Sequence, residues 1–144
     1  MKIVNGKNKS SIQNLPLKIF ASILPALIFA QDLLWLTANK AGAIWLLVFW
    51  VIIVVYVAKL EKYQSLFKIF RLTEAATFFA PIAVLIMALV LSSGEGGGVF
   101  MVMAGLMGMV ITAVVALFFG IIFHFIANSF KNKSGNIIAG ENTK

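Results

Sequence analysis

The longest apolar run of the chain, residues 99–127, is the feature that most restricts its fold. It contains no Asp, Glu, Lys or Arg, and as one straight helix at about 1.5 Å per residue it would measure about 44 Å. The hydrocarbon core of a bilayer is about 30 Å thick. A helix of this length must therefore tilt, bend or project beyond one face of a membrane, and Gly105 and Gly108 are candidate bend points.

Three further apolar runs, at residues 17–36, 41–58 and 74–91, are each about as long as a transmembrane helix requires. Of the 144 residues, 61% are hydrophobic and only 12% are charged, which leaves too few polar groups to cover a water-facing surface. The sequence therefore predicts an all-α integral membrane protein, a four-helix bundle with four spans. The chain has no cysteine, which excludes disulfides, thiolate nucleophiles and Cys-ligated metals.

The basic residues predict the orientation of these spans. With four spans, eleven of the twelve Lys and Arg residues fall on one side of the membrane, and only Lys40 falls on the other. Basic residues concentrate in cytoplasmic loops, so we expect both termini in the cytoplasm, and contact with anionic lipid on that side. The basic residues are not gathered into one polar module, so no nucleic-acid partner is predicted. We expect a multi-pass protein of a bacterial or archaeal cytoplasmic membrane.

The first apolar run has an alternative interpretation as a cleaved signal peptide. A basic arm, an apolar run and the segment IFA predict cleavage after Ala30. The residue at the third position before that bond is Ile28, where a small residue is usual, and cleavage would leave the new terminus directly against the second run. A retained first span, kinked at Pro25, is the favoured interpretation.

The polar segments divide the chain into regions. Residues 1–16 form a basic cytoplasmic arm, residues 17–130 the transmembrane domain, and residues 131–144 a polar cytoplasmic tail without a helical pattern. Within the domain, residues 59–73 carry apolar side chains at helical spacing with charged ones between them. This pattern predicts an amphipathic helix in the cytoplasmic headgroup layer, either as a lipid-covered connector or as a docking site for a soluble partner.

Within the apolar run at residues 99–127, every fourth position carries a small or hydroxyl-bearing residue. This stripe consists of Ala104, Gly108, Thr112, Ala116 and Gly120. Small residues at this spacing let helix backbones approach closely in lipid. The stripe drifts by about 40° every four residues, so a helix that follows it would cross with right-handed geometry. Such a helix belongs to the same bundle, to a second copy of the chain or to another membrane subunit.

Glu74 and His124, the only histidine, are candidates for a polar or proton site. Both lie at the cytoplasmic ends of their spans, so we expect them at the same depth, where such a pair could relay protons. The alternatives are a histidine bonded to water, to a backbone carbonyl or to Asn128, and a Glu74 that pairs with Arg71 three residues back.

Asp32 is the third candidate for the polar or proton site. It lies toward the outer end of the first span, with Lys40 across the turn as a candidate neighbour. Intramembrane acids are costly and usually functional. At this position, however, we expect the carboxyl group at the membrane interface rather than in an ion site.

Catalysis is not predicted. The serines at positions 92 and 93 and His124 lie at opposite ends of their spans, about 30 Å apart, whereas a Ser–His dyad needs about 3 Å. One histidine without cysteine also gives no zinc site, and no cofactor or metal is expected. We therefore predict a non-catalytic accessory, assembly or scaffolding subunit of a membrane complex. The alternative is a small oligomeric transporter, channel or holin-like pore, which requires Asp32, Glu74 or His124 to line a wet path.

Overall fold

The structure is a computed structural model that describes residues 14–37, 42–93 and 98–141. Its elements are, in chain order, α2 (Leu15–Ala21), α3 (Ile23–Thr37), α4 (Gly42–Ala58), α5 (Lys62–Ser92) and α6 (Gly98–Glu141). Every regular element among these described residues is an α-helix, with no strand among them. The all-α prediction is therefore confirmed.

Three stretches of helix are long and apolar enough to cross a bilayer: Leu15–Leu34, Lys62–Ser92 and Gly98–Ser134. They support the prediction of a membrane protein. The second predicted span coincides with α4, whose 17 residues give a helix of about 25 Å at about 1.5 Å per residue. This length is short of a hydrocarbon core of about 30 Å, so a fourth crossing stays a prediction.

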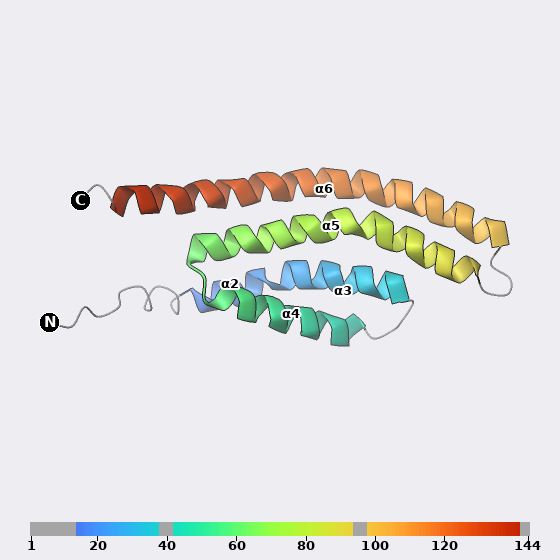
Figure 1. Cartoon of the computed structure of the whole chain (residues 1–144), viewed down its shortest axis with the longest axis horizontal. Coiled ribbons are helices and arrows are strands. Elements are labelled where there is room, and N and C mark those ends of the chain that lie inside the picture. The colour runs from blue at the N-terminus through green and yellow to red at the C-terminus, as the bar shows by residue number, and fades with distance from the viewer. Residues whose placement is uncertain (1–13, 38–41, 94–97, 142–144) are drawn as a thin grey trace.

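Successive long helices run antiparallel, and the α5–α6 pair extends well beyond the end of the α3–α4 pair (Figure 1). Helix α3 packs on both α4 and α5, whereas α6 packs mainly on α5. The helices therefore do not close around one central core, as the predicted four-helix bundle would, and α6 lies at an edge. Because lipid tails are as apolar as a helix surface, no hydrophobic force requires α6 to bury a second face.

The main cluster of buried apolar side chains lies where α3, α4 and the first turns of α5 meet: Ala26, Ile53, Val57 and Ile69. The partly buried rings of Phe29 and Phe49 stack beside it, with centroids 5.6 Å apart. This cluster joins the α3–α4 pair to α5 and sets the register of the two pairs.

The first predicted span is divided into α2 and α3 at Ser22, three residues before Pro25. Proline has no N–H, and its ring crowds the carbonyl four residues earlier, which is that of Ala21. The Ser22 hydroxyl donates to the carbonyl oxygen of Ile19 at 2.7 Å, and the indole N–H of Trp50 donates to the same oxygen at 3.1 Å. A side chain of α4 therefore bonds to the carbonyl next to the break.

Helix α5 runs without interruption from Lys62 to Ser92, which corrects the expectation of a separate amphipathic helix at residues 59–73. The segment is helical from Lys62 onward, but it continues directly into the third predicted span. No glycine or proline lies between Glu61 and Pro81 to break it. Its inner side is buried against the other helices, at Ser65, Leu66, Ile69 and Thr73.

Helix α6 has 44 residues, which gives a length of about 66 Å. It curves gently and extends past the start of α5 (Figure 1). The expectation of a tail without helical structure is wrong as far as Glu141. Each residue added to an existing helix gains a hydrogen bond without a new nucleation step, and no proline follows Gly98 to stop it.

Candidate functional site

Helix α6 packs on α5 through glycine positions. The backbone of Gly105 lies so close to the Cβ of Ala88 that no side chain fits between them. A Cβ at Gly108 would lie 3.3 Å from the nearest side-chain atom of α5, and one at Gly120 would lie 2.5 Å from the Phe78 ring. The small residues of α6 therefore permit a close approach along much of the helix pair.

The five residues of the predicted stripe differ in exposure. Two are buried, two are half-buried and one is exposed, in the order Ala116, Gly120, Gly108, Thr112 and Ala104. A spacing of four drifts around the helix by about 40° per step. Toward the start of α6 the close contact with α5 is therefore made by Gly105, whereas Ala104 points away from it.

The buried positions of α6 are Gly105, Ala116, Gly120 and Ala127. Three of them, Gly105, Ala116 and Ala127, succeed one another at intervals of eleven residues. An eleven-residue repeat corresponds to about 3.67 residues per turn and favours a right-handed superhelical path. This period keeps one face of α6 against α5 for two repeats.

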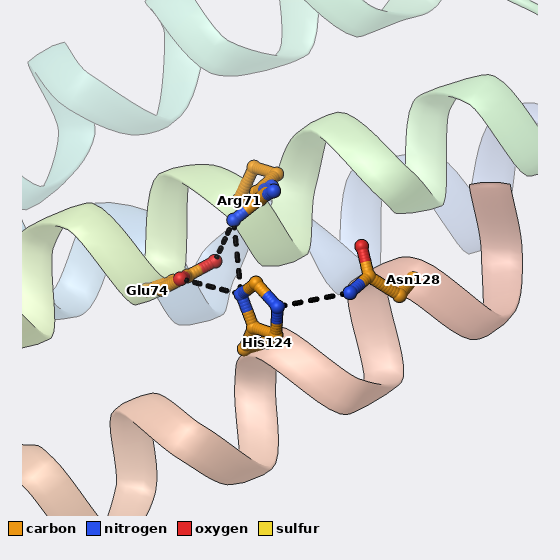
Figure 2. Close-up of polar contacts among 4 residues, drawn as sticks. All are labelled: Arg71, Glu74, His124 and Asn128. Carbon is orange, nitrogen blue, oxygen red and sulfur yellow. Dashed lines mark hydrogen bonds and ion pairs between the residues drawn. The ribbon is translucent and has the colours of Figure 1, made fainter.

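A polar network joins α5 to α6 (Figure 2). Arg71 Nη1 and Glu74 Oε2 are 2.7 Å apart, and Glu74 Oε1 lies 3.0 Å from His124 Nδ1. The amide nitrogen of Asn128 lies 2.9 Å from His124 Nε2. The structure therefore places Glu74 beside His124, and it also gives each of them the neighbour named as its alternative.

One arrangement of protons satisfies the contacts of Glu74 and Asn128 in this network. With the proton of a neutral His124 on Nδ1, that N–H donates to Glu74, and Nε2 accepts from the Asn128 amide. Arg71 then donates to the other carboxylate oxygen. Arg71 Nη1 also lies 3.1 Å from His124 Nδ1, and with a hydrogen on each nitrogen this contact is not a hydrogen bond. Glu74 is therefore the acceptor that Arg71 and His124 share.

Asp32 of α3 lines a cavity of about 450 Å³ formed by α3, α5 and α6. The residue is only 4% exposed, and its Oδ2 has no hydrogen-bond partner in the described part of the chain. Three further lining residues carry polar groups, namely Gln31, Thr77 and Thr112. The remaining lining side chains are aliphatic or aromatic. We call this space the Asp32 cavity.

The Asp32 cavity lies beside the middle of α5, since its α5 residues are Thr77, Ala80 and Val84. Helix α3 ends well short of the tip of α5 (Figure 1), so a residue near the end of α3 reaches only the middle of the longer pair. A count of residues that gives all four spans one depth predicts Asp32 near an outer surface. Lys40, its expected neighbour, lies outside the described residues.

Lys18 is a second buried charged residue of the first span, at 1% exposure. Its ammonium donates to the carbonyl oxygens of Ala58, at 3.3 Å, and of Leu60. These carbonyls stand at the C-terminal end of α4, where helical partners are lacking and the helix dipole is negative. By charge alone, Lys18 belongs with the cytoplasmic basic residues of the amino-terminal arm. Its position inside an apolar run was the available signal.

A second cavity, of about 540 Å³, lies where α3 and α4 meet α5. Aromatic and aliphatic side chains of α3 and α4 form most of its wall, and Lys68 and Arg71 of α5 contribute to its lining. It combines an apolar surface with two basic groups, which is the arrangement that a lipid chain with an anionic headgroup requires.

Within the described residues, no group of three or more His, Asp or Glu side chains is placed to hold a metal ion. Comparisons with known protein families, curated proteins and solved structures find no match to this chain. The function is therefore inferred from two features of the structure: the exposed side of α6 and the Asp32 cavity.

Proposed function

We propose that this protein is a non-catalytic accessory, assembly or scaffolding subunit of a membrane complex, and that α6 forms its contact with the other subunits. The observation that supports this most directly is the position of α6 at the edge of the fold. It packs mainly on α5, and only 11% of its most apolar stretch is buried, against 33% for the first candidate span. Such a helix has most of its surface available to a neighbour.

The outward side of α6 carries a ridge of large apolar side chains, each more than half exposed: Phe100, Met107, Ile111, Val114, Phe118, Ile121 and Phe125. We call this set the α6 ridge. Its steps of three, four and seven residues are those that a second helix lying along α6 would contact. The close packing of Gly105 and Gly120 on α5 fixes the direction in which the ridge points.

The proposal includes four crossings with both termini in the cytoplasm. The first residue of α2 and the last of α6 lie at the same end of the helices (Figure 1), which agrees with an even number of crossings. With its 17 residues, α4 is at the short limit of about 17 to 25 for a spanning helix. The excess of basic residues on one side supports the orientation.

The experiment is purification of the tagged chain from native membranes in mild detergent, followed by native mass spectrometry. A stoichiometric foreign subunit is the expected result. A double substitution on the ridge, Ile111→Ala with Val114→Ala, should release it. The matched control is Ile52→Ala with Val55→Ala, which has the same spacing and similar exposure on α4 and should leave the complex intact. A bare monomer, or equal loss in both variants, would overturn the proposal.

A second candidate function is that of a small oligomeric transporter, channel or holin-like pore. The Asp32 cavity favours it, because a carboxyl group beside the middle of α5 is the polar feature that a path through the membrane needs. A homo-oligomer without foreign subunits would point to this candidate. In proteoliposomes, Asp32→Asn or His124→Ala would then abolish flux, whereas an accessory subunit would tolerate both changes.

We also propose that anionic lipid contacts the cytoplasmic side of the protein. The cavity beside Lys68 and Arg71 supports this, because two basic groups adjoin an apolar wall. Lys62, Lys68 and Arg71 also lie within three turns of the start of α5, within about 14 Å along the helix axis.

A further inference from the structure

We propose that the Asp32 cavity binds a hydrophobic organic cation, an ammonium or phosphonium ion with aryl or alkyl substituents. This site is separate from the α6 ridge, and the inference goes beyond the proposed assembly function. It rests on a buried acidic group without a partner, on the few oxygen atoms around it, and on the size, lining and opening of the cavity.

The first argument is the state of the carboxyl group. Asp32 is 4% exposed, and its Oδ2 has no hydrogen-bond partner among the described residues. A buried carboxylate without a counter-charge is costly in an apolar environment. The guanidinium of Arg71 does not serve as that counter-charge, since it pairs with Glu74 at 2.7 Å. A cation in the cavity would give Asp32 the partner that the described chain does not supply.

The second argument excludes a bare metal ion. Calcium takes about six to eight oxygen ligands, and magnesium requires near-octahedral coordination. The cavity offers one carboxylate, the Gln31 amide and the hydroxyls of Thr77 and Thr112. Both hydroxyls donate to backbone carbonyls, at 2.8 Å and 2.7 Å, and their lone pairs stay available. The four side-chain groups together still fall short of the oxygen ligands that either ion takes. An organic cation needs one counter-charge and no such set of ligands.

The third argument concerns shape and surface. The volume of about 450 Å³ lies in the range of about 300 to 1,000 Å³ that suits a drug-sized ligand. Phe119 and Phe123 belong to the wall, and aromatic faces attract cations. Val115 and Phe119 are 49% and 46% exposed, so the cavity opens sideways between α3 and α6. A hydrophobic cation can enter from the lipid by this route.

The test uses the full chain in nanodiscs of zwitterionic lipid, with isothermal titration calorimetry and empty nanodiscs as the baseline. The probe is tetraphenylphosphonium, and tetraphenylborate is its control, because the two ions share a shape and differ in the sign of the charge. We expect the protein to bind the cation and to bind the anion at least about tenfold more weakly. Asp32→Asn should weaken cation binding by about tenfold or more and leave the anion unchanged.

Two further variants keep the test decisive if Asp32→Asn proves unstable. Phe119→Leu removes an aromatic wall of the cavity and should weaken cation binding severalfold. Phe20→Leu changes an exposed ring of α2 that lies outside the cavity lining and the α6 ridge, and it should have no effect. Equal binding of both ions, or full cation binding by Asp32→Asn, would overturn the inference. So would binding that appears only after Lys40→Gln, because Lys40 would then be the partner of Asp32. None of these outcomes bears on the α6 ridge.

Discussion

Lys18 and Asp32 are both buried in the first candidate span, at 1% and 4% exposure, yet their surroundings differ. Lys18 donates to two carbonyl oxygens at the end of α4, and it thereby joins two helices. Asp32 faces a cavity, and its Oδ2 is unpartnered in the described chain. Burial of a charge does not by itself mark a functional site; what matters is whether the fold supplies the partner. By this criterion Lys18 is structural and Asp32 is available to a ligand.

The largest expected effect comes from Lys18→Met, which keeps the apolar stem and removes the ammonium. The carbonyl of Ala58 then loses its bond to the ammonium, and the carbonyl of Leu60 keeps only the Ser65 hydroxyl as a side-chain donor. A hydrogen bond to a charged group contributes about 1.5 to 3 kcal/mol. We expect the free energy of unfolding to fall by about 3 kcal/mol, measured by denaturation in mixed detergent micelles. Lys59→Met, at an exposed position beside the same helix end, should change it by less than about 0.5 kcal/mol. Equal losses of stability in Lys18→Met and Lys59→Met would show that the bonds of Lys18 do not stabilise the fold.

The next effect tests whether the α6 wall of the Asp32 cavity is held in place by packing on α5. Gly105→Leu forces a side chain against Ala88, whose Cβ cannot move without its backbone, and overpacking of this kind costs about 1 to 3 kcal/mol. We expect the free energy of unfolding to fall by about 2 kcal/mol in the same denaturation assay. Cation binding, measured by titration calorimetry in nanodiscs, should also become weaker. Ala104→Leu places the same side chain on the exposed side and should leave stability unchanged. If Ala104→Leu instead dissociates the complex purified from native membranes, Ala104 belongs to an intermolecular contact.

A smaller change, of opposite sign, is expected at Asp32. Asp32→Leu replaces an unpartnered buried polar group with an apolar one of similar size, an exchange that is often neutral or stabilising. We expect a gain of about 1 kcal/mol in the free energy of unfolding, together with loss of cation binding. A loss of stability as large as that of Lys18→Met would erase the contrast between the two residues, because it would show that Asp32 has a structural partner.

The helices of the fold were largely predictable from the sequence, whereas their relative positions along the helix axes were not. Apolar length and composition identified the helices, because a bilayer admits few other spanning structures. The register between the α3–α4 pair and the α5–α6 pair depends on local contacts such as Val57 against Ile69, which no periodicity encodes. For this reason Asp32 was expected at an outer surface and lies beside the middle of α5.

The polar network shows the converse case. Glu74 and His124 lie at matching positions in adjacent antiparallel helices, so a count of residues from the ends of the spans was enough to bring them together.

The continuous path of α5 could not be read in the same way. The polar pattern of residues 59–73 is the same for a helix lying on a membrane and for one that continues into it, and only the burial of Ser65 and Thr73 distinguishes them.

The smallest predicted effect belongs to Glu74, a charged residue whose case lies between those of Lys18 and Asp32. Its side chain is 13% exposed and it has two partners, but Arg71 and His124 are 42% and 44% exposed. Ion pairs with exposed partners contribute about 0 to 1 kcal/mol. Glu74→Gln keeps an acceptor for His124 and loses the charge, so we expect a loss of about 0.5 kcal/mol in the same denaturation assay. Glu61→Gln, at the exposed start of α5 where no side-chain cap forms, should have no effect. A loss at Glu74 as large as that at Lys18 would mean that the network holds α5 and α6 together. The number of hydrogen-bond partners and their burial would then no longer predict how much each charged residue contributes to stability.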